Sequence, residues 1–340
     1  MTTADGTRMR ANGALFSVLR NDKLDLRVLP TEQCNFRCTY CYETFKHKRM
    51  PPTVVRGVKA LIDRRAASLT ELHLDWFGGE PLVAFDVVRD ISGHALRVTE
   101  AHAIHFTSGM TTNGYFLDRP CFQKCLDLKI NAFQISLDGK KEVHDRSRVL
   151  GSGGGTFDRI WSNLLGMRAT ERTFNVVLRV HYTKENHAHI ADLAGLLGDT
   201  FGGDRRFTVY FRHIARLGGP NDDKIAVPSP AERAVIEAGL HKALGHDQVS
   251  SVDETYVCYA AHANSLVIRS NGKLSKCTVA LEDDFNIIGE LSEKGEIVAD
   301  QTKFQRWISP ALEGRWEDLA CPLHLVSQRA KAAAEAVPLG

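Results

Sequence analysis

Long apolar runs and secretion signals are both missing from this chain of 340 residues. Its apolar stretches fall short of the roughly 18 residues that a membrane-spanning helix requires, so we expect no such helix. Residues 1–23 also lack the basic stretch followed by an apolar stretch that marks a signal peptide. These absences predict a cytoplasmic protein.

A strong excess of charge is missing as well. The chain has 43 Lys and Arg residues against 41 Asp and Glu residues, which gives a formal net charge of +2 at pH 7. A balance this even gives no reason to predict a nucleic-acid or membrane partner. The 14 histidines show no HExxH or other metal-binding spacing, so a histidine-based metal site is not predicted.

Eight cysteines remain to be explained. A disulfide framework does not suit a cytoplasmic chain of this size, whereas clustered thiols indicate metal binding or catalysis. Six of them fall into two groups, one near the N-terminus and one after residue 216: Cys34, Cys38, Cys41, Cys258, Cys277 and Cys321. Cys121 and Cys125 are one helical turn apart, as on a core-facing stripe, and we interpret them as structural.

Alternating apolar residues predict six strands with helices between them. The expected strands are 24–29, 72–77, 104–110, 133–137, 174–180 and 207–211. The expected helices are 52–67, 84–100, 117–128, 156–170 and 187–198. Repeated strand–helix units imply right-handed crossovers and a parallel sheet. We therefore predict an α/β fold, a partial (β/α)6 TIM-like barrel over residues 24–215, with its chemistry at the C-terminal ends of the strands.

The remaining sequence divides into three parts. Residues 1–23 are an N-terminal extension, and residues 216–257 are a linker with one helix at about 230–244. Residues 258–340 are a small C-terminal domain. Within it, Asn271 and Gly272 separate two strand-like stretches, which predicts a β-hairpin over 264–277. A stretch rich in Ala and Lys, 328–336, indicates a final helix or a frayed tail.

The first cysteine group follows the first expected strand. Cys34, Cys38 and Cys41 have C-x3-C-x2-C spacing, and a loop folded back on itself can direct three thiolates at one iron–sulfur cluster. Three protein ligands leave one iron open to an outside ligand. The alternatives are a zinc site or free thiols, but zinc sites usually contain two separated C-x2-C pairs.

Glycine-rich and polar motifs follow the later strands. Gly78 and Gly79 allow the backbone to approach a ligand closely, and Glu80 after them can accept a hydrogen bond from an ammonium group. The same motif also suits a plain turn with an exposed glutamate. Further candidates on or after the third to fifth strands are Asn113, Ser136, Arg148 and Arg179. Asn113 could serve only as a turn cap, and either arginine could form a surface ion pair.

In this order the motifs resemble those of the radical S-adenosylmethionine (SAM) superfamily. The cysteine spacing, with the aromatic Tyr40 before the last cysteine, is that superfamily's signature. The resemblance implies that SAM chelates the open iron of a [4Fe-4S] cluster. One electron then cleaves SAM to methionine and a 5′-deoxyadenosyl radical, which takes a hydrogen atom from the substrate. The resemblance also implies SAM contacts from Tyr40, Gly78, Gly79, Glu80, Asn113 and Ser136, and from Arg148 or Arg179 to the SAM carboxylate.

The motif order is similar, more narrowly, to the SPASM/twitch subgroup, which includes anaerobic sulfatase maturases and ribosomal-peptide-modifying enzymes. Members carry auxiliary [4Fe-4S] clusters bound through a Cys followed by G-x4-C, a pattern like Cys258 and then Gly272 to Cys277. Only three cysteines follow residue 216, so the resemblance implies a shortened domain with one cluster on Cys258, Cys277 and Cys321. The fourth position falls to His324, Asp318, substrate or water; alternatively, the three are buried thiols.

The resemblance implies hydrogen abstraction from a peptide or protein side chain, giving a cross-link or a dehydrogenated residue. No catalytic side chain is assigned. The expected partners are the peptide, an electron donor such as flavodoxin or ferredoxin, and a separate leader-binding protein if residues 1–23 are too short for that role. The alternatives are a twitch-type dehydrogenase of a small metabolite, such as a sugar alcohol, and a non-catalytic iron–sulfur protein. Retention of the cysteine triad and of Glu80 argues against the last.

Overall fold

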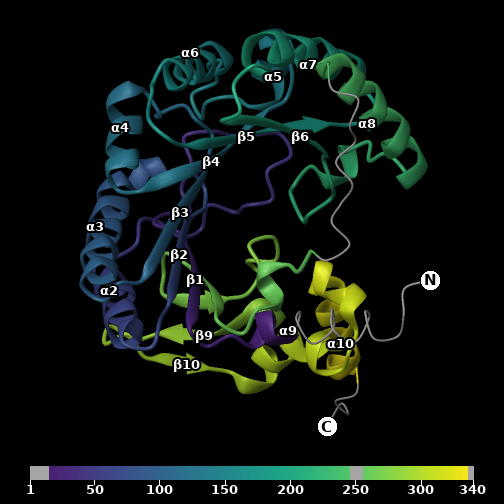
Figure 1. Ribbon diagram of the computed structural model, residues 1–340. Coiled ribbons are helices and arrows are strands. Elements are labelled where there is room, and N and C mark those ends of the chain that lie inside the picture. The colour runs from purple at the N-terminus through teal and green to yellow at the C-terminus, as the bar shows by residue number, and fades with distance from the viewer. Residues whose placement is uncertain (1–14, 246–255, 336–340) are drawn as a thin grey trace, which may run out of the picture.

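The computed structural model describes residues 15–245 and 256–335 of the chain. Its strands are β1 (Lys23–Val28), β2 (Glu71–Trp76), β3 (His105–Thr112), β4 (Ile130–Leu137), β5 (Asn175–Tyr182), β6 (Phe207–His213), β7 (Ser265–Ile268), β8 (Lys273–Ser275), β9 (Ile287–Leu291) and β10 (Ile297–Ala299). Its helices are α2 (Pro52–Ala66), α3 (Phe85–Ala101), α4 (Arg119–Asp127), α5 (Lys141–Ser147), α6 (Phe157–Arg168), α7 (His187–Phe201), α8 (Pro230–Leu244), α9 (Gln301–Leu312) and α10 (Leu323–Glu335). Figure 1 shows the strands in an arc with α2 to α7 along its outside.

One ten-stranded sheet runs through the structure in the order β10-β9-β8-β7-β1-β2-β3-β4-β5-β6. Each of β1 to β6 pairs in parallel with the next, so their carboxyl ends meet along one edge of the sheet. Strands β6 and β10 stand at opposite ends of this order. The barrel is therefore partial, as the sequence predicts.

Alternation along the strands sorts side chains between the two faces of the sheet. In β1, Leu24, Leu26 and Val28 are fully buried in the main core, on the face covered by helices. Asp25 and Arg27 point to the opposite face and line a cavity inside the arc. The side of β1 away from the helices is consequently polar.

The C-terminal segment continues the barrel sheet. Strand β7 pairs in parallel with β1, and β8, β9 and β10 follow in antiparallel order. The predicted hairpin is confirmed, and Gly272 in its turn has a φ of 86°, a conformation that favours glycine. The division into residues 24–215, 216–257 and 258–340 stays a prediction, because the last part shares its sheet with the first.

All six barrel strands and the five predicted helices are present within a few residues of their expected bounds. The helix expected at 230–244 is α8, which begins with a capping box between Ser229 and Glu232. The sequence patterns gave no sign of α5, α9, β9 or β10, and α10 begins earlier than the expected 328. Several of these elements are too short to show a clear period. Within the described residues, no helix is long and apolar enough to span a bilayer.

Candidate active site

A cavity of about 280 Å³ lies at the carboxyl ends of the barrel strands. It brings together nine of the predicted cluster and SAM-binding residues: Cys34, Cys38, Tyr40, Cys41, Gly78, Gly79, Asn113, Ser136 and Arg148. Arg179 lines the same cavity, so both candidates for the SAM carboxylate are present. Glu80 lies behind the cavity wall, and Cys258, Cys277 and Cys321 lie in the C-terminal segment.

The cysteine loop (residues 29–51) connects β1 to α2 and presents its three thiols to this cavity. All three are free and half-buried. The backbone N–H of Phe36 donates to the sulfur of Cys34 at 3.3 Å, a contact of the kind that stabilises a cluster thiolate. Burial raises the pKa of the Cys34 and Cys41 thiols to about 12, so a metal must displace their protons on binding. Three free thiols around one cavity fit a [4Fe-4S] cluster with one open iron.

Gly78 and Gly79, which follow β2, pack directly against the backbone of this loop. A Cβ atom on Gly78 would overlap the carbonyl oxygen of Thr31, and one on Gly79 would lie 2.5 Å from that of Gln33. Gly78 also has a φ of 113°. The N–H of Glu80 donates to the same Gln33 oxygen at 3.1 Å. The glycines are therefore needed for the approach of the cysteine loop, in addition to lining the cavity.

Glu80 is fully buried and already has its own donors. Its carboxylate accepts from the N–H of Leu82 at 3.0 Å, the hydroxyl of Thr112 at 2.8 Å and the N–H of Asn113 at 2.7 Å. Asn113 in turn donates its side-chain amide to Asn35 of the cysteine loop at 2.8 Å. In this geometry Glu80 ties the end of β2 to the end of β3. Its predicted contact with the SAM ammonium stays a prediction.

A buried polar network joins the cysteine loop to β4, β5 and the end of α5. The hydroxyl of Tyr40 donates to Asp138 at 2.9 Å and accepts from Arg148 at 2.8 Å. His181 lies 3.2 Å from both Tyr40 and Asp138, and Ser147 donates to Asp138 at 2.7 Å. Burial alone would raise the pKa of Asp138, but the bond from His181 and the charge of Arg148 hold it below its ordinary range. The network fixes Tyr40 beside the three thiols.

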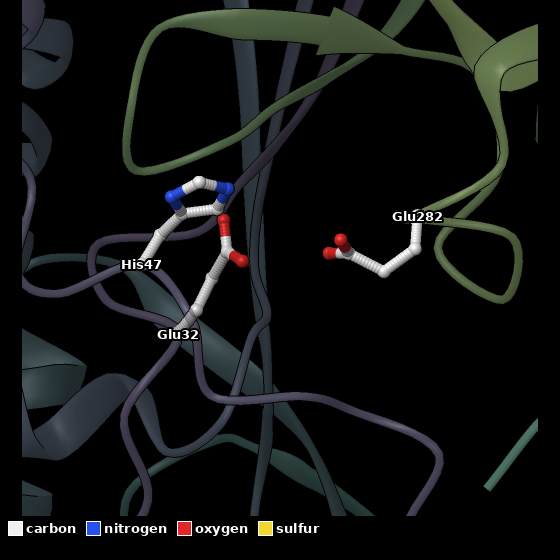
Figure 2. A group of neighbouring side chains, drawn as sticks. All are labelled: Glu32, His47 and Glu282. Carbon is white, nitrogen blue, oxygen red and sulfur yellow. The ribbon is translucent and has the colours of Figure 1, made fainter.

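A second network ties the cysteine loop to the C-terminal segment. Figure 2 shows Glu282 extending toward Glu32 and His47, and ligand atoms of the three lie within 4.8 Å of one another. Such a group could hold a cation, but the guanidinium of Arg269 already donates to Glu32 at 2.7 and 3.1 Å and to Glu282 at 2.6 Å. Arg269 and Glu32 are both almost fully buried. We interpret the cluster as an ion-pair clamp.

The C-terminal cysteines come from separate segments: Cys277 follows β8, and the N–H of Cys258 donates to the carbonyl of Leu319, two residues before Cys321. Cys258 is half-buried, Cys277 is buried and Cys321 is exposed, and all three are free thiols. Burial raises the pKa of Cys277 to about 11, with smaller contributions from Cys258 and Cys321. The N–H of Val279 donates to the Cys277 sulfur at 3.4 Å. Cys258 and Cys321 therefore lie near Cys277, and their predicted role as ligands of one auxiliary cluster stays a prediction.

The two side chains predicted as a fourth ligand, Asp318 and His324, are not singled out by their contacts. Asp318 accepts from Arg315 at 2.6 Å, and His324 is exposed on α10. The fourth position therefore stays open between these residues, substrate and water. Cys125 is fully buried in the main core and Cys121 packs against that core, as expected of structural cysteines.

The fold and cavity define a class of protein: a partial-barrel enzyme with a three-thiolate iron–sulfur loop at the carboxyl ends of its strands. The profile of the Radical SAM superfamily matches residues 28–197, half of the chain. The chain belongs to this superfamily. Its members use a [4Fe-4S] cluster and SAM.

Individual relatives support this membership. A cysteine-type anaerobic sulfatase-maturating enzyme of Clostridium novyi is 28% identical over 166 residues, which cover 46% of this chain and 43% of that protein. A GTP 3′,8-cyclase of Microcystis aeruginosa is 24% identical over 322 residues, which cover 84% of this chain and 86% of that protein. Over several curated relatives, the chain spans less than half of the relative's length.

Solved structures share the fold. The enzyme anSMEcpe with bound AdoMet superposes with a TM-score of 0.64 at 18% identity, over 88% of each chain. SuiB of Streptococcus suis, bound to its precursor peptide SuiA, superposes with a TM-score of 0.56 at 15% identity, over 94% of this chain and 74% of that one. At these identities the likeness concerns the fold.

Several residues around the cavity were not singled out from the sequence. His181 and Arg212 both line it, and Asp138 anchors Tyr40. A signal was available: His181 is two residues after Arg179 on β5, so both fall on the same inner face. The Arg269 clamp had no local signal, because Glu32 and Arg269 are far apart in the sequence.

We expect Gly79→Ala to displace the cysteine loop, because the added methyl group would overlap the Gln33 carbonyl. The free energy of unfolding should fall by about 1–3 kcal/mol, and iron per chain after anaerobic reconstitution should fall clearly below wild type. Gly166→Ala is the control. Nothing lies within 4 Å of its new Cβ on α6, so iron content should hold. Normal iron binding by Gly79→Ala would contradict the proposed support.

We expect Glu80→Ala to destabilise the fold, because three donors lose their buried acceptor at about 1–3 kcal/mol for an unsatisfied group. Chemical denaturation measures this loss, and the exposed Glu142→Ala is the control. If stability is unchanged and only SAM affinity falls, the carboxylate serves the SAM ammonium instead of the strand ends.

Proposed function

We propose that this radical SAM enzyme acts on a peptide or protein side chain and leaves a cross-link or a dehydrogenated residue. The observation that carries the proposal is the shared cavity, in which the three loop thiols and the predicted SAM contacts meet at the open edge of the barrel. The relatives add support. One is a sulfatase-maturating enzyme, and SuiB is bound to a precursor peptide. The peptide substrate and the kind of bond formed are both parts of what we propose.

The chain's own residues have distinct roles in this scheme. When bound, the cluster and SAM supply one-electron cleavage of SAM and the resulting 5′-deoxyadenosyl radical. Cys34, Cys38 and Cys41 hold the cluster, while Gly78 and Gly79 let their loop pack closely. Tyr40, held by Asp138 and Arg148, is positioned to contact SAM. Asn113 and Ser136 would contact SAM from the ends of β3 and β4.

We further propose that the C-terminal segment is a shortened SPASM/twitch-like domain. Cys258, Cys277 and Cys321 would hold one auxiliary [4Fe-4S] cluster there, either to take up an electron from the substrate or to bind it. The Arg269 clamp supports this arrangement, because it links that segment to the cysteine loop.

The remaining partners follow from this chemistry. A reduced flavodoxin or ferredoxin would donate the electron, and a separate leader-binding protein could recruit the peptide. The eight free thiols suit a reducing compartment such as the cytoplasm.

A second candidate is an enzyme that acts on a small metabolite. The match to a GTP 3′,8-cyclase extends over 84% of this chain, more than the match to the sulfatase-maturating enzyme. Co-expression with neighbouring open reading frames, followed by mass spectrometry of short peptides, separates the two. A mass change in such a peptide supports the first candidate. An unmodified peptide together with a modified metabolite supports the second.

The triple variant Cys34→Ala, Cys38→Ala, Cys41→Ala should form no 5′-deoxyadenosine, because it holds no electron source beside SAM. The assay is anaerobic incubation with SAM and dithionite, followed by chromatography. Cys121→Ala, which alters a thiol outside the cavity, is the matched control and should retain the product. Deoxyadenosine from the triple variant would refute the cluster assignment.

Reconstituted wild type should bind about eight irons per chain, as two clusters of four. The variant lacking Cys258, Cys277 and Cys321 should bind about four and should still cleave SAM, but it should not form product. Iron and sulfide analysis measures the first result and product mass the second. A wild type that saturates at about four irons has no auxiliary cluster, and the C-terminal segment then serves only to hold substrate.

A further inference from the structure

Three arginines line the active-site cavity: Arg148, Arg179 and Arg212. Glu43 is the one carboxylate among the described residues that line it. The side chains therefore give this cavity an excess of positive charge. Among the expected cofactors, SAM brings a sulfonium as well as a carboxylate, and the negative charge of the thiolate-bound cluster lies beside Arg148.

Arg148 is committed to the cysteine loop. It donates to the hydroxyl of Tyr40 at 2.8 Å and is almost fully buried beside the thiols. Tyr40, Cys38 and Asp138 raise its pKa well above the ordinary value, against the effect of burial. Its charge is thus offset by the site itself.

Arg179 and Arg212 have no such offset. In the β5–β6 register Arg179 faces Tyr210 and Arg212 faces His181, so the two arginines are diagonal neighbours on the inner face. Within the described part of the chain, neither forms an ion pair, and the buried Nε of Arg179 has no hydrogen-bond partner. Arg212 is exposed at the cavity mouth. Two adjacent guanidinium groups without a counter-charge repel each other, and an oxyanion between them would remove that cost.

His213 also lines the cavity but adds no charge to it. Burial and, after it, the charges of Arg233, Arg212 and Arg179 lower the pKa of His213 to about 4. His213 is therefore neutral at pH 7 and leaves the anion to the arginines.

We propose that Arg179 and Arg212 form a subsite for an anionic group of the substrate, a carboxylate or a phosphate. The fork of each guanidinium suits either oxyanion. The inference rests on the proposed function in taking this cavity as the substrate site, and it leaves Arg148, the other predicted partner, to the SAM carboxylate. It selects acidic peptides or phosphorylated metabolites over neutral and basic substrates.

The test is anaerobic isothermal titration of the reconstituted holoenzyme with SAM bound, using inorganic phosphate and succinate as separate probes. Wild type should bind at least one probe. Arg212→Met should bind it about tenfold more weakly or worse, and Arg212→Lys should fall between the two because it keeps the charge but loses the fork. Arg205→Met is the matched control, because Arg205 is exposed beside the opposite end of β6 and should bind like wild type.

Each outcome has a stated meaning. Binding of phosphate alone supports a phosphorylated substrate, and binding of succinate alone supports a carboxylate. Equal probe affinity in wild type and Arg212→Met, or no binding by wild type, overturns the subsite. Loss of SAM affinity in Arg212→Met with unchanged probe affinity also overturns it, since the arginine then serves SAM. The result is independent of whether a peptide is modified, so the subsite and the peptide proposal can fail separately.

Discussion

The carbonyl oxygens of Thr31 and Gln33 occupy the space that side chains on residues 78 and 79 would need. This backbone-to-backbone approach sets the height of the cysteine loop above the end of β2. Glu80 then binds Asn113, and Asn113 binds Asn35 within the loop. The position of the three thiols therefore depends on contacts that only glycine permits. The hydrogen bonds from Asn113 to Glu80 and to Asn35 hold the loop at the same place.

The active site is assembled from segments far apart in the chain. Arg269, in the β7–β8 turn, binds Glu32 two residues before the first cysteine, and β7 extends the barrel sheet beside β1. The C-terminal segment is thus connected to the cysteine loop both through the sheet and through a buried ion pair. Removing one member of such a pair would leave a buried charge without a partner, which is costly. This coupling gives a physical route by which the C-terminal cysteines and the SAM cavity hold a fixed relation.

The cavity arginines differ in their partners. Arg148 is compensated by Asp138 through Tyr40, whereas the half-buried Arg179 and the exposed Arg212 form no ion pair with a carboxylate among the described residues. The compensated arginine orders the loop. The uncompensated pair remains available for a ligand, which gives the two groups different roles despite their common chemistry.

The sequence by itself determined the parallel α/β barrel, because strand alternation and helix spacing are local properties. It also determined the cysteine loop, because Cys34, Cys38 and Cys41 lie within eight consecutive residues. Local turn chemistry also gave the hairpin at Gly272. Only the tertiary structure decided that Glu80 is enclosed between strand ends, that Arg269 clamps Glu32, and that Arg179 and Arg212 lie together with no counter-charge from the residues that the structure describes. Each of these depends on which distant residues the fold brings into contact and on how deeply it buries them. The spacing of neighbouring residues in the sequence predicts neither.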